Sequence, residues 1–225
     1  MRLKLVIFDV DGTLVDSQGL IIEAMNLAFD GEGLAPPSRK DTLSIVGLSL
    51  DVAMFKLLPE ADATLRARLV DGYKQGYMHR RAETGVAQSS PFFAGARDVL
   101  ERLRAQDDVL LGVATGKSRR GLDKLIDGHG LQGMFVTTQV ADDHPSKPHP
   151  SMITTALAET GVDARDAVMI GDTSYDMEMA AAAGVAGIGV GWGYHARDAL
   201  GAAHRIVEDF AALENALTQI WEGQP

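Results

Sequence analysis

The sequence predicts an α/β fold, a doubly wound and mostly parallel sheet with an all-helical domain inserted after its first strand. Short apolar runs bounded by turn residues alternate with amphipathic helical patterns, which is typical of a parallel sheet covered by helices on both faces. The alternation of strands and helices is interrupted once, because residues 9–108 contain several helical patterns and no convincing strand. The break predicts that one interval between strands has become a separate helical unit.

Five short apolar runs are the predicted strands of the sheet. They begin at Leu3, Val109, Met134, Ala167 and Gly187, with the sequences LKLVIF, VLLGVA, MFV, AVMI and GIGV. The tail of the chain, RIVEDFAALENALTQIWEG, predicts a last short strand followed by a closing helix. No internal repeat interrupts this order, so the strands are expected to form one sheet.

The interval after the first strand has the periodicity of amphipathic helices. Two apolar stripes recur at helical spacing: Leu20, Ile21, Ala24, Leu27 and Ala28 in the first, and Leu65, Leu69, Tyr73 and Tyr77 in the second. The spacing of Ser38 and Asp41 after two prolines predicts a capping box. We therefore expect an all-helical inserted domain at 16–88 and a main domain at 1–15 and 89–225.

Composition limits the class of protein. The chain has 225 residues, 46% of them hydrophobic, and a formal net charge of −10, which disfavours non-specific binding to nucleic acid. The absence of cysteine excludes disulfides, thiol chemistry and Cys-ligated zinc. No apolar run resembles a secretory signal or a membrane span of about 20 residues. We expect a cytoplasmic protein without a membrane or nucleic-acid partner, and nothing in the sequence indicates its oligomeric state.

Two carboxylates, Asp9 and Asp11, come directly after the first predicted strand. Residues two apart on an extended chain point to the same side, so two negative charges are held together. Asp172 and Asp176 follow the fourth strand at i and i+4, which predicts that both lie on one face of the opening turn of a helix. Four carboxylates at one sheet edge repel each other unless a cation neutralises them, and oxygen ligands favour Mg²⁺.

The same edge receives groups suited to binding phosphate. Thr115 and Gly116 follow the second strand, and Ser118 begins the next helix, which places a hydroxyl and free N–H groups there. Lys147 follows the third strand in HPSKPHP, where prolines stiffen the backbone around one cation. Taken singly, each is an ordinary turn, cap or surface residue. Their coincidence at successive strand ends, where parallel sheets bind ligands, indicates one site.

These motifs, DVDGT, ATGKS, SKP and GDTSYD in this order with a helical insert after the first, resemble the haloacid dehalogenase superfamily. The similarity spans essentially the whole chain and is strongest to its phosphoglycolate phosphatase-like branch with a helical cap and a Rossmann-like core. The resemblance implies that Asp9 is the nucleophile and forms an aspartyl-phosphate, and that Asp11 is the general acid and base. Thr115, Gly116 and Lys147 would bind the phosphoryl group.

The resemblance also implies the metal ligands and the type of reaction. Mg²⁺ would be held by the Asp9 side chain, the Asp11 backbone carbonyl and Asp172, with Asp176 as a ligand or just behind one. Members that cleave carbon–halogen bonds lack a carboxylate at the position of Asp11, so its presence argues for a phosphatase acting on a small phosphorylated metabolite. In capped relatives, a loop corresponding to Gly47–Ser49 faces the site, which makes Gly47 and Ser49 candidate substrate-binding residues.

Two alternatives remain open at the level of sequence. A phosphosugar mutase of the same superfamily would carry the same motifs. A receiver-type phosphoacceptor domain also combines acids, a threonine and a lysine, but it is shorter and has no helical insert. The basic runs His79–Arg81 and Lys117–Arg120 are expected to be solvated helix faces, and His144 and His149 lack a third ligand for a metal site.

Overall fold

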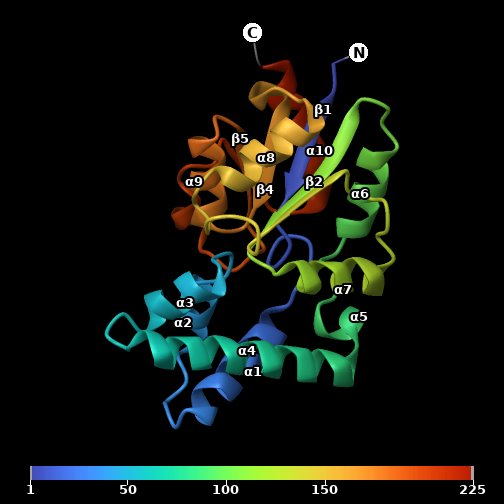
Figure 1. Ribbon diagram of the computed structural model, residues 1–225. Helices are drawn as coiled ribbons and strands as arrows, with labels where there is room; N and C mark the ends of the chain where they lie inside the picture. The colour runs from blue at the N-terminus through green and yellow to red at the C-terminus, as the bar shows by residue number, and fades with distance from the viewer. Residues whose placement is uncertain (1, 224–225) are drawn as a thin grey trace.

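The computed structural model describes residues 2–223, and its centre is a six-stranded sheet in which every neighbouring pair is parallel (Figure 1). The strand order is β3-β2-β1-β4-β5-β6. The strands are β1 (Lys4–Phe8), β2 (Val109–Thr115), β3 (Thr137–Val140), β4 (Ala167–Gly171), β5 (Ala186–Val190) and β6 (Arg205–Val207). This arrangement confirms the predicted doubly wound α/β class. All strands therefore end at one edge, and the order in which strands are added to the sheet reverses between β1 and β4.

The third strand is not where the sequence predicts it. The apolar run at 134–136 precedes the strand, which begins at Thr137. Met134 is buried in the core from a turn, whereas Val136 is 57% exposed. The strand itself is built from polar and β-branched residues, TTQV, which suit a pleated backbone without being apolar. The apolar run at 134–136 thus reflects the burial of Met134 and does not locate the strand.

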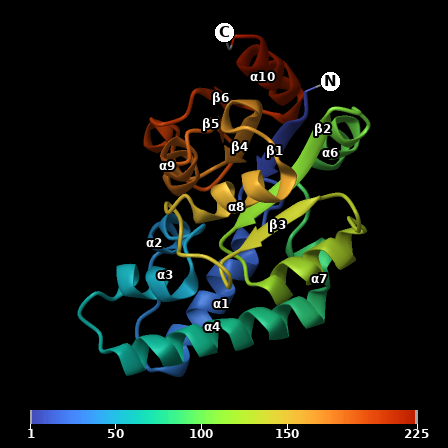
Figure 2. The same ribbon diagram turned by 45° about the horizontal axis from the view of Figure 1, so that its top comes forward.

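Helices cover both faces of the sheet (Figures 1 and 2). One face carries α6 (Ala96–Arg104), α7 (Arg119–His129) and α10 (Phe210–Glu222), and the other carries α8 (Ser151–Thr160) and α9 (Ser174–Ala182). Short 3₁₀ turns lie at Ala164–Asp166 and Arg197–Leu200. The side chains of β1 alternate between the two cores: Val6 and Phe8 pack on the first face, and Leu5 and Ile7 on the second.

Between β1 and α6 the chain forms five helices and no strand among the described residues. They are α1 (Gln18–Gly31), α2 (Arg39–Ser44), α3 (Leu50–Leu57), α4 (Ala63–Thr84) and α5 (Val86–Ser89). Figure 1 shows them beyond the carboxyl edge of the sheet. The chain enters and leaves this insert at one place, because Asp16 N–H donates to Pro91 O at 2.8 Å and Val15 forms a bridge with Phe92.

The insert has its own small core, as its apolar stripes predict. Leu20, Ile21, Ala24 and Ala28 are buried, and Leu27 is the exception at 44% exposure. The α1 helix packs closely on α4, where Leu69 is buried. The Ser38 hydroxyl caps α2 by accepting from Asp41 N–H at 3.1 Å, which is one half of the expected capping box. Within residues 2–223, no helix combines the length and apolarity needed to cross a membrane.

Candidate active site

A tight turn after β1 brings the first carboxylate to the sheet edge. Gly12 N–H donates to Val15 O at 2.9 Å, and Gly12 has a φ of +84°, a conformation that side chains rarely adopt. A Cβ at Gly12 would also lie 2.2 Å from Asp172 Oδ2. Only glycine fits this turn, and its close approach places the segment of Asp9 beside Asp172.

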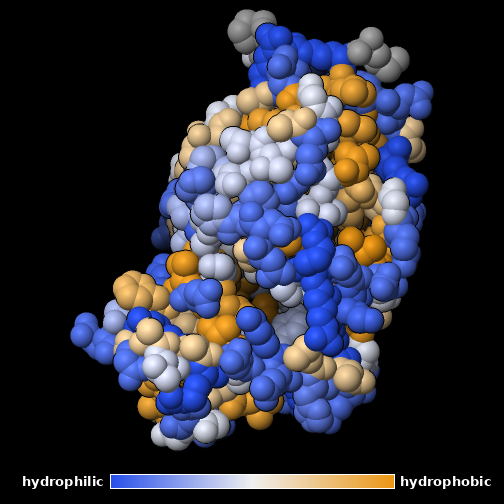
Figure 3. All heavy atoms as spheres, in the orientation of Figure 1, coloured by the Kyte–Doolittle hydropathy of each residue, from blue (hydrophilic) through white to orange (hydrophobic). Residues whose placement is uncertain are grey.

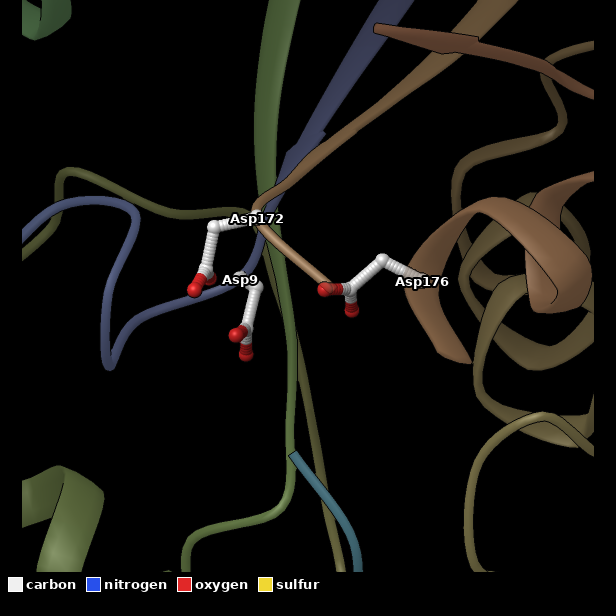
Figure 4. A group of neighbouring side chains, drawn as sticks. All are labelled: Asp9, Asp172 and Asp176. Carbon is white, nitrogen blue, oxygen red and sulfur yellow. The ribbon is translucent and has the colours of Figure 1, made fainter. Parts of the chain in front are cut away.

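Three buried carboxylates converge at this edge. Asp9 follows β1, Asp172 follows β4 and Asp176 lies in α9; one oxygen of each lies within 4.8 Å of the others. Figure 4 shows the Asp9 and Asp172 side chains side by side, with the Asp176 carboxylate reaching toward them from α9. Their exposures are 1%, 0% and 0%. Three negative charges are thus held together away from water.

The helical spacing predicted for Asp172 and Asp176 is wrong in detail. The α9 helix begins at Ser174 with Thr173 as its N-cap, so Asp172 precedes the helix. Asp176 closes a capping box: its Oδ2 accepts from Thr173 N–H at 3.1 Å and from the Thr173 hydroxyl at 2.7 Å. The two carboxylates meet because one leaves a strand and the other caps the next helix, not because they share a helix face.

Lys147 is the cation of this cluster. Its Nζ lies 2.9 Å from Asp9 Oδ1 and 2.6 Å from Asp176 Oδ1, and its side chain is completely buried. Burial lowers the pKa of Lys147, but the charges of Asp176 and Asp9 outweigh it and raise the pKa above its ordinary value. Lys147 is therefore a charged group built into the site, as its position at a strand end predicts.

The charges and unmet oxygens of the cluster fit a divalent cation. Asp9, Asp172 and Asp176 with Lys147 leave a formal charge of −2, which one divalent cation balances. Among residues 2–223, the Asp9 oxygens have no well-aligned hydrogen bond; the Lys147 contact is an ion pair and Oδ2 has no partner. Burial raises the pKa of Asp9 to about 7. The charges of Asp176 and Asp11 add to this increase, whereas the charge of Lys147 opposes it. Burial and the charges of Asp9 and Asp176 raise the pKa of Asp172 as well.

Asp11 has a separate set of neighbours. Its Oδ1 accepts from the Ser17 hydroxyl and lies 2.8 Å from Lys117 Nζ, which also donates to the Tyr77 hydroxyl at 3.0 Å. The Lys117 side chain is only 8% exposed, so the prediction of a solvated helix face is wrong at this residue. Burial lowers the pKa of Lys117, but the charge of Asp11 outweighs it and raises the pKa. The side chain of Asp11 is not in the three-carboxylate cluster.

Two further residues orient Asp172, and no sequence pattern predicted their role. The Thr13 hydroxyl donates to Asp172 Oδ1 and Tyr194 N–H donates to Asp172 Oδ2, both at 2.8 Å. Tyr194 also accepts from Ser17 N–H at 2.9 Å through its hydroxyl. Tyr194 follows β5 in the stretch GWGYH, so the rule that sites gather at the ends of parallel strands could have found it.

A cavity of about 320 Å³ lies between the sheet edge and the helical insert. Figure 3 shows a hollow between these two parts, with hydrophobic residues inside it. Asp9, Asp11, Thr115 and Gly116 line it from the core, and Gly47 lines it from the insert. Thr115 is buried, and its hydroxyl accepts from Lys117 N–H at 3.2 Å.

The segment between α2 and α3 closes directly on the core. A Cβ at Gly116 would lie 2.6 Å from Gly47 O, so the two backbones are in contact. Ser49 is not among the residues that line the cavity; its N–H donates to Ser146 Oγ at 2.9 Å, which ties the insert to the loop of Lys147. Of the two residues predicted in this segment, the structure places Gly47 at the cavity and Ser49 at the contact behind it.

The remaining predicted groups divide between the cavity and the surface. Arg81 and Arg120 line the cavity, whereas Arg80 pairs with Glu23 and Glu83. His144 bonds Ser151 Oγ and Gln139 Oε1, both at 2.8 Å. Both ring nitrogens of His144 are thus engaged by neighbouring side chains.

Comparison with known proteins assigns the family. Residues 6–190 match the family described as haloacid dehalogenase-like hydrolase. The chain is 36% identical over 220 residues to the protein named "Probable phosphatase IndB" of Dickeya dadantii, covering 94% of this chain and 92% of the relative. It is 30% identical over 215 residues to a phosphoglycolate phosphatase of Yersinia pestis, with the same coverage. The crystal structure of a hydrolase from Pseudomonas syringae superposes with a TM-score of 0.83 at 25% identity, covering 96% of this chain and 99% of that one. With its fold, its converging carboxylates and these relatives, the chain is an enzyme that belongs to the haloacid dehalogenase-like hydrolase family.

Proposed function

We propose that the protein is a magnesium-dependent phosphatase that hydrolyses the phosphomonoester of a small metabolite through an aspartyl-phosphate on Asp9. The observation that carries the proposal is the buried cluster in which Asp9, which lines the cavity, pairs with Lys147 and lies close to two further carboxylates. The family and the relatives named as phosphatases support the reaction class.

A divalent cation in this site would be held by Asp9 and Asp172, with Asp176 as a ligand or just behind one and the Asp11 backbone carbonyl as the expected fourth group. When bound, such a cation supplies positive charge to the phosphoryl oxygens as negative charge develops on them. Magnesium fits because the donors are carboxylate oxygens and because it binds through few carboxylates plus phosphate. The Thr13 and Tyr194 hydrogen bonds fix the direction of Asp172.

Asp9 is placed to attack phosphorus. Lys147 holds Asp9 Oδ1 at 2.9 Å and orients the carboxylate, which leaves Oδ2 without a protein partner among the described residues. Thr115 and Gly116 lie at the same cavity floor and would bind the phosphoryl oxygens through hydroxyl and backbone N–H. Attack forms the bond between Asp9 and phosphorus and breaks the bond to the alcohol oxygen.

Asp11 would donate a proton to the leaving alcohol oxygen and later accept one from the water that hydrolyses the aspartyl-phosphate. It lines the cavity, and its side chain is held by Ser17 and Lys117 apart from the three clustered carboxylates. These contacts fix the rotamer of Asp11, so that its carboxyl group stays at the cavity while Asp9 reacts.

The helical insert serves as a cap over this site, with 16–88 as the cap domain and 1–15 with 89–225 as the catalytic core. Both linkers run together at Asp16 and Pro91, which is the place where a hinge would act. Closure keeps bulk water from the phosphoryl group, and opening admits substrate and releases product.

The test is a screen of purified protein with Mg²⁺ against a panel of phosphorylated metabolites. Phosphate release and isomer formation are measured in the same reactions, because the mutase alternative would yield isomers without free phosphate. We expect continuous phosphate release that requires Mg²⁺ and stops with a chelator. Isomer formation without phosphate would favour the mutase, and undiminished activity in excess chelator would contradict the metal site.

A further inference from the structure

The cavity has an apolar wall on the side of the cap. The cap side chains that line it and are at most 7% exposed are all apolar: Ile21, Met25, Ile45, Val46, Leu48 and Ala53. They belong to the two hydrophobic clusters of the insert, so the wall is the inner surface of the cap core. The part of a bound substrate that extends from the phosphoryl site toward the cap would therefore contact apolar side chains first.

The polar groups near this wall are few. The Tyr77 hydroxyl accepts from Lys117, so it is already engaged. Tyr73 also lines the cavity, and its hydroxyl forms no hydrogen bond with any other residue between 2 and 223. Burial, followed by Tyr77 and Asp11, raises the pKa of Tyr73 well above its ordinary value, so the hydroxyl keeps its proton and can donate. One unengaged donor thus lies beside an otherwise apolar wall.

Three cationic side chains at the cavity would favour a substrate with a second anionic group. Lys74, Arg81 and Arg120 also line the cavity. Lys74 and Arg120 are exposed, and Arg81 lies over the Tyr77 ring at 5.6 Å. Exposed charges are screened by salt and attract any phosphorylated molecule without fixing its far end. We therefore assign these three cations to attracting the substrate, and we assign recognition of its alcohol part to the buried apolar wall.

We infer that the alcohol part of the substrate is a mostly apolar, ring-sized group and that the Tyr73 hydroxyl binds its polar substituent. The inference rests on the proposed phosphatase function and names the substrate class of that site. A cavity of about 320 Å³ has more room than a two-carbon acid uses and falls at the small end of the roughly 300–1,000 Å³ range of ligand pockets. A carboxylate such as that of phosphoglycolate would lose its water against this wall, and the single Tyr73 hydroxyl would replace only part of that hydration.

The experiment compares kcat/KM for benzyl phosphate, ethyl phosphate and phosphoglycolate, three esters of unactivated alcohols. We expect benzyl phosphate to exceed both others at least tenfold, since even one methylene in an apolar pocket is worth about 10- to 200-fold. Val46→Thr keeps the shape of the wall but adds a hydroxyl, and it should reduce the ratio of benzyl to ethyl phosphate several-fold. Because this ratio is taken within one protein sample, partial unfolding of the variant does not alter it.

The role of Tyr73 is tested with 3-hydroxybenzyl phosphate against benzyl phosphate. Tyr73→Phe should lower kcat/KM for the hydroxylated ester about tenfold and change that for benzyl phosphate little, as expected for one lost hydrogen bond. An equal change on both esters would show that Tyr73 does not bind the substituent.

The outcomes separate this inference from the proposed function. If neither these esters nor any compound of the metabolite panel releases phosphate above the background of Asp9→Asn, the phosphatase assignment itself fails. If phosphoglycolate or ethyl phosphate is hydrolysed as efficiently as benzyl phosphate, the phosphatase assignment stands and the inferred substrate class is wrong.

Discussion

Asp9 and Asp11 are two residues apart in the sequence, yet their side chains have different neighbours. Asp9 lies with Lys147 and the other clustered carboxylates, and Asp11 is held by Ser17 and Lys117. Because a carboxylate's chemistry follows its surroundings, the two residues are suited to different tasks. The separation supports a nucleophile at Asp9 and a proton donor at Asp11.

The first prediction follows from these two tasks. Asp9→Asn should abolish turnover and covalent phosphorylation, because an amide is a poor nucleophile. Asp11→Asn should slow turnover by roughly 10² to 10⁴, the contribution typical of general acid–base catalysis. Steady-state assays and mass spectrometry of acid-quenched protein measure both effects. Covalent phosphate on any residue other than Asp9 would contradict the assignment.

The second prediction concerns Lys117, which fixes Asp11. Lys117→Met keeps the length of the side chain and removes its charge, so kcat should fall about tenfold or more, as expected for a lost charged hydrogen bond. Lys117→Arg should restore part of the loss. Tyr77→Phe removes the other partner of Lys117 but keeps the Asp11 pair, so it is the matched control and should have a smaller effect on kcat. Similar losses of kcat in Lys117→Met and Tyr77→Phe would show that the Lys117–Tyr77 contact matters more for catalysis than the Lys117–Asp11 pair.

Asp9, Thr115, Lys147 and Asp172 each follow a predicted strand, and this position predicted that they would gather at one sheet edge. Lys117 is within the same motif as Thr115, but its position did not predict its place in the site. The burial of Lys117 depends on Tyr77, which comes from a helix of the insert. A contact between distant segments leaves no periodicity or spacing in the sequence, so it appears only in the folded chain.

Among the elements, the segment between α2 and α3 joins the cap to the site. Gly47 has a φ of +96°, and its carbonyl oxygen occupies the place where a side chain at Gly116 would extend. The sequence predicted that this segment faces the cavity, which is so for Gly47. It gave no sign of the backbone contact, because two glycines far apart in a sequence do not reveal that they touch.

The third prediction is that Gly47 supports the fold of this segment more than it selects a substrate. Gly47→Ala should lower the free energy of unfolding by roughly 1–3 kcal/mol, the cost of a strained backbone conformation. It should reduce kcat/KM on all substrates alike. Gly19→Ala is the matched control, because Gly19 lies in a helix with open space around it and should be neutral or slightly stabilised. Urea denaturation and assays on two substrates test both. A change confined to one substrate would assign specificity to Gly47.

The fourth prediction concerns the junction of α7 with the linker that leaves the insert. His129 bonds Ser90 O at 2.9 Å through Nε2. Burial lowers the pKa of His129, with Arg97 adding to the effect and the Ser90 bond opposing it. Because the folded pKa lies below the unfolded value of about 6.5, the contribution to stability is complete above pH 6.5 and is lost as the pH falls through the folded pKa.

His129→Gln should therefore flatten the loss of unfolding free energy between about pH 7 and pH 5. Urea titrations at several pH values measure the slope, which is compared with that of the wild-type protein. His79→Gln, at a histidine whose side chain is 70% exposed on α4, controls for the loss of one histidine. An unchanged slope in His129→Gln would show that another group governs stability in this range.

At the scale of the whole molecule, the sheet and the helical insert could be predicted from the sequence, but the position of the insert on the sheet edge could not. Alternating apolar runs and helical stripes determine the sheet and the insert, because both reflect local burial. The third strand was misplaced because Met134 packs into the core from a turn. How the cap sits on the sheet edge depends on contacts such as Tyr175 OH to Ser44 O at 2.8 Å, which join residues 131 positions apart.

The fifth prediction is a change in global stability with metal. A cation that binds only the folded state adds about 2.7 kcal/mol when its concentration is 100 times its Kd, which raises the Tm by several degrees for a chain of this size. Mg²⁺ should therefore stabilise the wild-type protein, and Asp172→Asn should lose most of that shift. Differential scanning calorimetry measures it without substrate. An equal shift in Asp172→Asn would place the bound cation elsewhere.

The paired linkers have a consequence for how this chain could be rebuilt. The insert departs and returns at adjacent backbone positions, joined by the Asp16–Pro91 hydrogen bond. A segment that begins and ends at these adjacent positions does not interrupt the sheet, so we expect that the five helices could be replaced together as one cassette. Since the clustered carboxylates and Lys147 all lie outside it, a different cassette could redirect the same hydrolytic machinery to other esters.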